Sequence, residues 1–201
     1  MPLTAKIEIE GKIYELPVIV GTENEKAVDI AKLRQQTFYI TLDPGFGNTG
    51  ACQSAITYLD GEQGILRYRG IPIEQVAEKS TFVETAYLLI YGELPTRPQL
   101  TQFSQSFTRH APIHEDMKNF FQGYPATGHP IAILSAMVCA LSAYYPELIN
   151  PEPAREEIDT SAVQLMAKSR TIAAYSYKKA NGEACIPPRE DLQYIPNFLH
   201  M

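Results

Sequence analysis

The sequence predicts a mainly α-helical fold that carries a small β-rich segment at its N-terminus. Residues 131–145 form an uninterrupted run without a charge, and Pro130 and Pro146 stand at its two ends. Further stretches between residues 72 and 180 show helix-start signals followed by spaced apolar residues. Only the first twenty residues and a short stretch near residue 60 alternate in the manner of strands.

The charge-free run 131–145 is predicted to be a single helix, roughly 22 Å long at about 1.5 Å per residue. Proline is tolerated in the first helical turn and stops a helix after the last one, so Pro130 and Pro146 set its ends. The run is shorter than the ~20 apolar residues of a membrane span. A helix that is apolar all round is expected to be buried all round, and its small residues would let neighbouring backbones come close.

Composition limits the classes of function. The 201 residues include 23 acidic and 17 basic ones, which gives a formal net charge of −6 and argues against a nucleic-acid partner. The cysteines Cys52, Cys139 and Cys185 lie far apart, so they suggest neither a zinc ribbon nor a disulfide framework. The first residues contain no apolar signal region, and we expect a cytoplasmic protein.

The first forty residues are predicted to form a separate β-rich appendage, and residues 41–201 the helical domain. Apolar residues alternate over residues 4–20 around a break at Glu10–Lys12, which predicts a β-hairpin. Residues 22–36 are predicted to form a short helix that Thr22 caps. Residues 37–42 are rich in β-branched and aromatic residues and are expected to be extended.

Two turn-rich motifs come next in the chain. Gly45, Gly47 and Gly50 satisfy the spacing G-x-G-x-x-G, but a dinucleotide site needs a strand before this motif and a helix after it. The residues directly after Gly50 are β-like, so a plain turn is the preferred interpretation. Residues 56–59 and 64–69 predict a second hairpin around Asp60 and Gly61.

Helix signals dominate from residue 72 onward. Pro72 opens one helix, and Thr81 with Glu84 forms a capping box for the next, which ends near Gly92. Thr96 is placed to cap another helix. The predicted helices cover residues 72–79, 82–92, 97–110, 114–124, 131–145 and 154–180, and a further apolar helix begins near residue 197.

No catalytic constellation can be built from the residues alone. His110 and His114 have the spacing of a metal pair, but Pro112 lies between them and no third ligand is evident, so no metal site is expected. Glu115 and Asp116 are interpreted as a solvated first turn rather than an acid–base pair. Cys139 is interpreted as a buried small hydrophobe.

Arg67 and Arg69 would point the same way on a strand. They could bind a carboxylate or phosphate, or form an ion pair at the sheet edge, and the ion pair is the preferred alternative.

Taken together, the motifs resemble citrate synthase in its longer bacterial form, which has an extra N-terminal β-rich segment. They follow the family's order over essentially the whole chain. The motifs are TLDPGF (41–46), ITYLDGEQGILRYRGIPIEQ (56–75), AYLLIYGELPT (86–96), TRHAPIHEDM (108–117), GHPIAILSAMVCALSAYY (128–145) and PREDLQYIPNFLHM (188–201).

The resemblance implies an enzyme that condenses acetyl-CoA with oxaloacetate and water to give citrate and CoA, the entry step of the tricarboxylic acid cycle. Acetyl-CoA is a substrate, and no cofactor is expected. The family's catalytic Asp and His residues lie in its C-terminal half, and no residue of this sequence matches them. Residues 41–201 therefore resemble only the first half of the large helical domain, and this chain alone is expected to be inactive. The alternatives are 2-methylcitrate synthase and a non-catalytic self-assembly fragment.

The resemblance also implies partners. The charge-free helix matches one that packs across the two-fold axis of the family's homodimer, and three such dimers can form a hexamer. The expected interface residues are Ile131, Ser135, Ala136, Cys139, Ala140 and Ala143. An inhibitory NADH site of some bacterial members matches Arg109, His110, Tyr145 and Lys168, whereas Gln164 stands at one of its basic positions.

Overall fold

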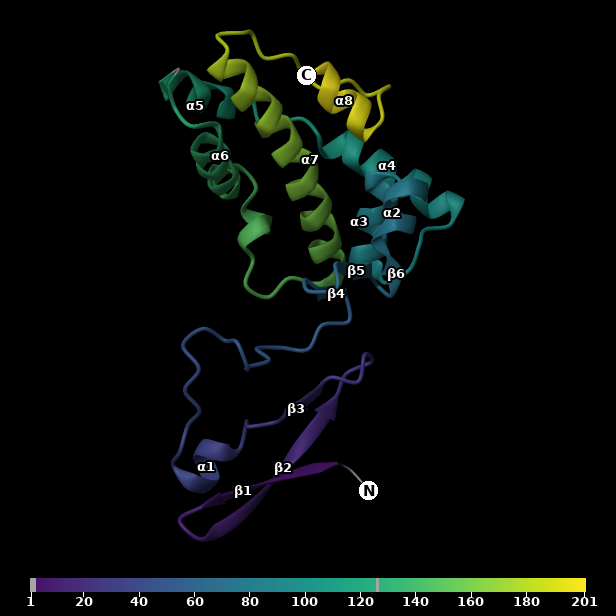
Figure 1. The fold of residues 1–201 in the computed structure, drawn as a ribbon. Helices are drawn as coiled ribbons and strands as arrows, with labels where there is room; N and C mark the ends of the chain where they lie inside the picture. The colour runs from purple at the N-terminus through teal and green to yellow at the C-terminus, as the bar shows by residue number, and fades with distance from the viewer. Residues whose placement is uncertain (1–2, 126) are drawn as a thin grey trace. The chain divides into compact units, whose positions relative to one another are not determined.

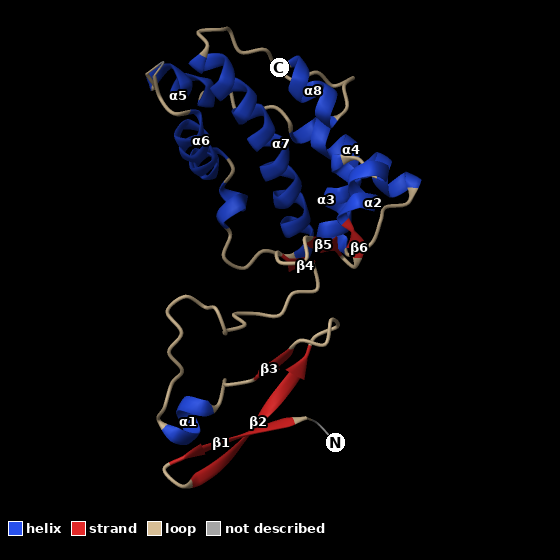
Figure 2. Ribbon diagram, viewed as in Figure 1, coloured by secondary structure: helices blue, strands red, loops and turns tan. Residues whose placement is uncertain are grey.

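The structure is a computed structural model that describes residues 3–125 and 127–201 (Figure 1). It divides into two compact units, Met1–Ser54 and Ala55–Met201. The sequence-based boundary after residue 40 falls inside the first unit. Helices dominate the second unit (Figure 2), so the predicted mainly α-helical class with a small N-terminal β-rich segment is confirmed. Within the described residues, no helix combines the length and the apolar character that a membrane crossing requires.

The first unit is built on an antiparallel sheet with the strand order β1-β2-β3. β1 (Thr4–Ile9) and β2 (Lys12–Val20) form the predicted hairpin. Glu10 and Gly11 connect them with φ values of 52° and 77°, as a tight hairpin turn requires. Leu16 on β2 is buried in this unit, and so is Leu33 on α1 (Leu33–Thr37).

The predicted helix over residues 22–36 is wrong for most of its length. β3 (Lys26–Val28) pairs instead with the end of β2, with Val18 opposite Val28, and within this range only the part of α1 from Leu33 to Gln36 is helical. Helix nucleation is unfavourable, and a short isolated helix is marginal in water. The free edge of β2 offers ladder hydrogen bonds that the local sequence does not reveal.

A second antiparallel sheet opens the helical unit. It contains β4 (Thr57–Asp60), β5 (Ile65–Tyr68) and the two-residue β6 (Ile71–Pro72), so the second predicted hairpin is confirmed. The Asp60 carboxylate accepts hydrogen bonds from the backbone amides of Glu62 and Gln63, which closes the turn.

The helices between residues 73 and 110 begin and end close to where their capping signals predict. α2 (Ile73–Lys79) follows Pro72, and the capping box of Thr81 and Glu84 starts α3 (Phe82–Tyr91). Gly92 ends α3 with a φ of 90°, a conformation that favours glycine. Thr96 caps α4 (Arg97–His110) together with Gln99.

The long helix α7 (Arg155–Ala180) runs through the helical unit between α6 (Pro130–Tyr144) on one side and α4 on the other (Figure 1). α5 (Met117–Gly123) packs near α6, the 3₁₀ turn η1 (Pro146–Ile149) joins α6 to α7, and α8 (Tyr194–His200) packs on α3, α4 and α7.

Two clusters of buried side chains lie against the two sides of α7. One gathers Ile113, Met117, Phe121, Ile133, Met137, Leu141, Ile172 and Tyr175. The other gathers Val83, Ala86, Phe103, Phe107, Val163 and Ala167. α7 therefore supplies the common wall of both clusters and holds the surrounding helices in place.

α6 is not buried on all sides within this single chain, so the rest of the described chain does not cover it completely. Its buried side chains, Ile133, Met137 and Leu141, are four residues apart and form one stripe. Leu134, Val138, Ala140 and Tyr144 beside this stripe are half-buried, whereas Ile131 is 65% exposed. The expected interface set forms the outer strip of α6: Ile131, Ser135, Ala136, Cys139 and Ala143 are exposed, and Ala140 is half-buried.

Candidate functional site

The connection between α4 and α5 is fastened to α7 by side chains that reach its backbone. The ammonium of Lys168 donates to the carbonyl oxygens of His110 and Pro112, at 3.1 and 2.8 Å. The hydroxyl of Thr171 donates to the carbonyl oxygen of Ala111 at 2.7 Å. Three successive carbonyl groups at the end of α4 thus accept hydrogen bonds from one face of α7. The last carbonyl groups of a helix have no partner within the helix, so these bonds satisfy acceptors that would otherwise be unpaired.

Burial disfavours the charge of Lys168, whereas its two carbonyl partners and the Tyr145 ring favour it. The residue is 4% exposed, and its ammonium lies 4.1 Å from the centre of the Tyr145 ring. Burial lowers the pKa of Lys168 to about 8, although the Glu147 carboxylate opposes this shift. Burial likewise raises the pKa of Tyr145.

His110 shares this environment. Burial lowers the pKa of its imidazole first, and the charges of Lys168 and Arg109 lower it further. The guanidinium of Arg109 donates to the Ser106 hydroxyl at 3.1 Å.

A cavity of about 430 Å³ lies beside this junction, between α3, α4 and the first turns of α7. Its lining includes Tyr87, Tyr91 and Phe103, whose rings contact one another. Arg109 and His110 line it from α4, and Glu156 and Asp159 from α7. The other lining residues are Gln99, Gln102, Ser106, Thr160 and Val163. The lining combines aromatic rings with charges of both signs, and its two carboxylates oppose a multiply charged anion.

Gln164 stands where the resemblance predicts a positively charged side chain, and it forms a neutral polar contact with Glu147. Its amide nitrogen donates to the Glu147 carboxylate at 3.3 Å, while its buried Oε1 has no partner among the described residues. A smaller cavity of about 190 Å³ adjoins, and its lining includes Glu147, Glu156 and Glu157. The region around Gln164 therefore carries several carboxylates, which oppose the binding of a phosphate group.

The structure brings together the four residues of the expected nucleotide site. Lys168 contacts His110 and Tyr145, and Arg109 is close enough to influence the pKa of His110. Only Arg109 and His110 line the larger cavity, whereas the Lys168 ammonium is engaged by backbone carbonyls. Whether a nucleotide binds here stays a prediction.

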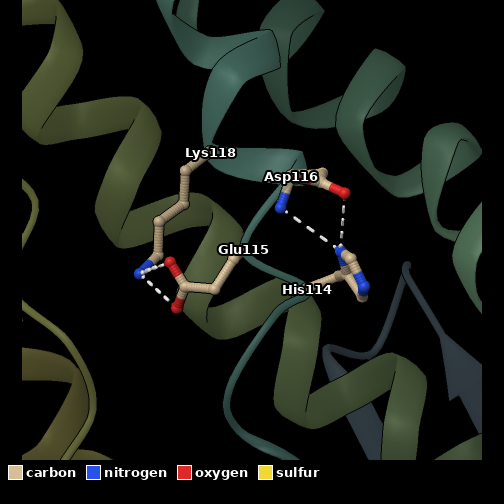
Figure 3. Close-up of polar contacts among 4 residues, drawn as sticks. All are labelled: His114, Glu115, Asp116 and Lys118. Atoms are coloured by element: carbon tan, nitrogen blue, oxygen red, sulfur yellow. Dashed lines mark hydrogen bonds and ion pairs between the residues drawn. The ribbon is translucent and has the colours of Figure 1, made fainter.

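The other sequence candidates do not form a reactive centre. His114 accepts a hydrogen bond from the Asp116 amide at 3.2 Å, and Glu115 forms an ion pair with Lys118 at 2.8 Å; both contacts are drawn in Figure 3. The His114 ring stacks on Tyr144 at 4.8 Å, and the described residues contain no group of three metal-ligating side chains. These residues are partly exposed, as expected for a solvated turn.

Arg69 does not share a strand face with Arg67, contrary to the sequence interpretation. It lies beyond β5 with a φ of 49°, and its guanidinium donates to the carbonyl oxygen of Leu89 at 2.6 Å. It therefore ties the small sheet to α3. Arg67 lies over the Tyr58 ring at 5.6 Å.

The glycine-rich segment 43–50 is a turn, as preferred. The carboxylate of Asp43 accepts hydrogen bonds from the amides of Gly47 and Asn48 and from the Thr49 hydroxyl. Neither a strand directly before it nor a helix directly after it is present in this described part of the chain, so the structural context of a dinucleotide motif is missing.

Sequence reasoning missed Thr171 and Glu147. Thr171 lies three residues after Lys168, so both must share a face of α7, and this spacing could have identified the pair. Glu147 lies in a turn, and only the fold brings it to Gln164.

Thr171→Val is expected to lower the free energy of unfolding by about 1–3 kcal/mol, since it leaves the buried Ala111 carbonyl without a donor. Urea unfolding measures the change. Thr160→Val is the matched control on the same helix, because the exposed Thr160 hydroxyl only bonds back to Glu156 within the helix. Equal small changes in both variants would contradict the assigned role of Thr171.

Comparisons with known proteins all point to the same family. Residues 45–201 match the family model described as citrate synthase, C-terminal domain. The chain is 46% identical over 198 residues to citrate synthase 1 of Mycobacterium tuberculosis, a match that covers 98% of the chain but only 46% of that protein. The chain therefore spans about half the length of the curated relatives it matches.

Solved structures agree with this match. The citrate synthase of Thermotoga maritima MSB8 superposes with a TM-score of 0.68 at 34% identity, over 80% of this chain and 41% of that one. That of Pyrobaculum aerophilum superposes with a TM-score of 0.70 at 32% identity, over 81% of this chain and 44% of that one.

Proposed function

Because the chain belongs to the citrate synthase family, we propose that it is part of an enzyme that condenses acetyl-CoA with oxaloacetate and water to citrate and CoA. The single observation that carries this proposal is the family match over residues 45–201, joined by 46% identity across nearly the whole chain. The acetyl group comes from acetyl-CoA as a substrate, and the reaction requires no further cofactor.

In this proposal, the chain supplies scaffold rather than chemistry. Condensation requires acid–base groups around the acetyl methyl group and positive charges around the carboxylates of oxaloacetate. No described constellation of this chain provides that set, whereas α7 and its two buried clusters give a rigid support. The catalytic groups are therefore assigned to sequence that corresponds to the other half of the relatives.

Release of the CoA thiol tests the activity. The gene product at the length of its relatives should release CoA from acetyl-CoA only when oxaloacetate is present, and the 201-residue chain alone should release none. A lack of activity at full length would refute the proposed function. Propionyl-CoA serves as the comparison substrate, because a faster rate with it would indicate 2-methylcitrate synthase.

The outer strip of α6 is proposed as a homodimer interface, and assembly of dimers into a hexamer is an extension of this proposal. The strip is apolar or small throughout and carries no charge, which is the composition of the buried core of homodimer interfaces. A cytoplasmic location belongs to the same proposal, since the three free cysteines fit a reducing compartment.

The cavity beside Arg109 and His110 is proposed as a nucleotide site of low affinity. Phosphate groups there would face Glu156 and Asp159, and Lys168 would have to leave its backbone partners to meet them. NADH is therefore expected to inhibit weakly in the CoA-release assay.

A further inference from the structure

Arg170 on α7 is a buried arginine with too few hydrogen-bond partners. The residue is only 6% exposed. Its Nη1 donates to the carbonyl oxygen of Tyr194 at 2.8 Å, and its guanidinium carbon lies 4.4 Å from the centre of the Tyr194 ring. Nε and Nη2 are buried and have no acceptor among the described residues. These two nitrogens carry more than half of the N–H donors of an arginine, so most of its donors are unpaired where water does not reach them.

No acidic group on the elements around Arg170 compensates its charge in the part of the chain that the structure describes. α4 and α8 contain no acidic residue, and the acids of α7 lie near its start. Glu84 is engaged in the capping box of α3, and Asp191 before α8 pairs with Arg189. Glu190 is exposed and forms no ion pair with Arg170. A buried ion without a counter-charge is costly, so this position calls for an anionic partner.

The surface beside Arg170 is apolar and exposed. The Tyr194 ring, which contacts Arg170, also stacks on the ring of Phe82 at 4.5 Å, and Phe82 is 45% exposed. Exposed apolar residues three and four positions apart form a stripe on α8: Ile195, Phe198 and Leu199. Exposed apolar side chains around an arginine and a tyrosine are typical of the centre of a protein interface.

We propose that Arg170 anchors an interface with the sequence that corresponds to the other half of the relatives, and that its guanidinium binds a carboxylate there. A carboxylate suits the unpaired nitrogens because it can accept two parallel hydrogen bonds from a guanidinium. Arg170 keeps some exposed surface, so a segment that packs on α7 and α8 meets the guanidinium after a turn of the side chain. The proposal rests on the proposed function in one respect, that the protein continues to the length of its relatives.

The carboxylate is assigned to the same polypeptide and not to a second copy. Tyr194 packs against the buried cluster of α3 and α4, whereas α6 contributes to the other cluster on α7. The strip proposed for the homodimer lies on α6, so the surface around Arg170 is separate from it. The curated relative from Mycobacterium tuberculosis is about twice as long as this chain, which leaves enough sequence to cover a second surface.

Urea unfolding of Arg170→Met at two chain lengths tests the proposal. In the 201-residue chain the variant should keep or raise the urea midpoint, because methionine removes a buried charge without a partner. In the gene product at the length of its relatives the midpoint should fall by about 1 M, because a buried carboxylate then loses its partner. Arg170→Lys keeps the charge and should recover part of this loss. Unfolding is followed without substrates, so the result does not depend on whether the protein makes citrate.

Arg189→Met is the matched control, because Arg189 is exposed and pairs with Asp191 at the surface. Its midpoint should equal that of the wild type at both lengths. If the 201-residue chain shows no cooperative transition, the longer protein decides through the order wild type, Arg170→Lys, Arg170→Met. Equal midpoints for these three, or an equal fall for Arg170→Met at both lengths, would overturn the proposal. A loss that disappears when the protein is diluted to the monomer would also overturn it, since the carboxylate would then belong to a second copy.

Discussion

Ala136→Glu is expected to separate the proposed homodimer into monomers. Ala136 lies on the exposed outer strip of α6, so in a single chain the new carboxylate would reach water and leave the fold intact. In a close crossing of two such helices it would be buried without a partner. That costs several kcal/mol, so the association constant should fall by at least about 100-fold. Sedimentation equilibrium measures the change.

Ala77→Glu provides the control for this experiment. Ala77 is an exposed alanine in α2, so the substitution adds the same charge to a helix without touching α6. Its sedimentation profile should match that of the wild type. Equal profiles for the Ala136→Glu variant and the wild type would show that the strip is not the interface.

Leu141→Ala is expected to lower the free energy of unfolding by about 2–5 kcal/mol. Leu141 is fully buried at 0% exposure, in the cluster that joins α6 to α7. Its removal loses apolar burial and leaves a cavity that the neighbouring side chains fill only in part. Unfolding in urea, followed by circular dichroism, gives the difference between variant and wild type.

Leu165→Ala is the matched control for Leu141→Ala. Leu165 also lies on a helix but is 37% exposed, so its truncation should cost about 1 kcal/mol or less. If the two variants lost equal stability, the stripe of α6 that faces α7 would not be the one assigned here.

The helices of the second unit could be predicted because their signals are local. The capping box at Thr81, the glycine at position 92 and the prolines around α6 act within one or two turns of the residues they affect. The same local reasoning failed for residues 22–36, where pairing of β3 with β2 decides the structure. Pairing of that kind depends on an edge that no local pattern describes.

The candidate site was only partly predictable for the same reason. The resemblance placed Lys168 near His110, but the sequence could not show that its ammonium binds carbonyl groups 56 and 58 residues away. The sequence also could not show that the Gln164 amide donates a hydrogen bond to the Glu147 carboxylate. The exposed strip of α6 reflects a further limit, because the lack of charge predicts burial without saying which surface covers the helix.

The reactivity of Cys139 tests the central claim, that a second copy covers the outer strip of α6. All three cysteines are exposed in the single chain, and only Cys139 lies on the strip, so Cys52 and Cys185 serve as references. Alkylation by iodoacetamide can be followed for each cysteine by mass spectrometry at increasing protein concentration. The account predicts that Cys139 becomes protected as the protein associates and stays reactive in the Ala136→Glu variant. Equally fast alkylation of Cys139 in wild type and variant at every concentration would contradict it.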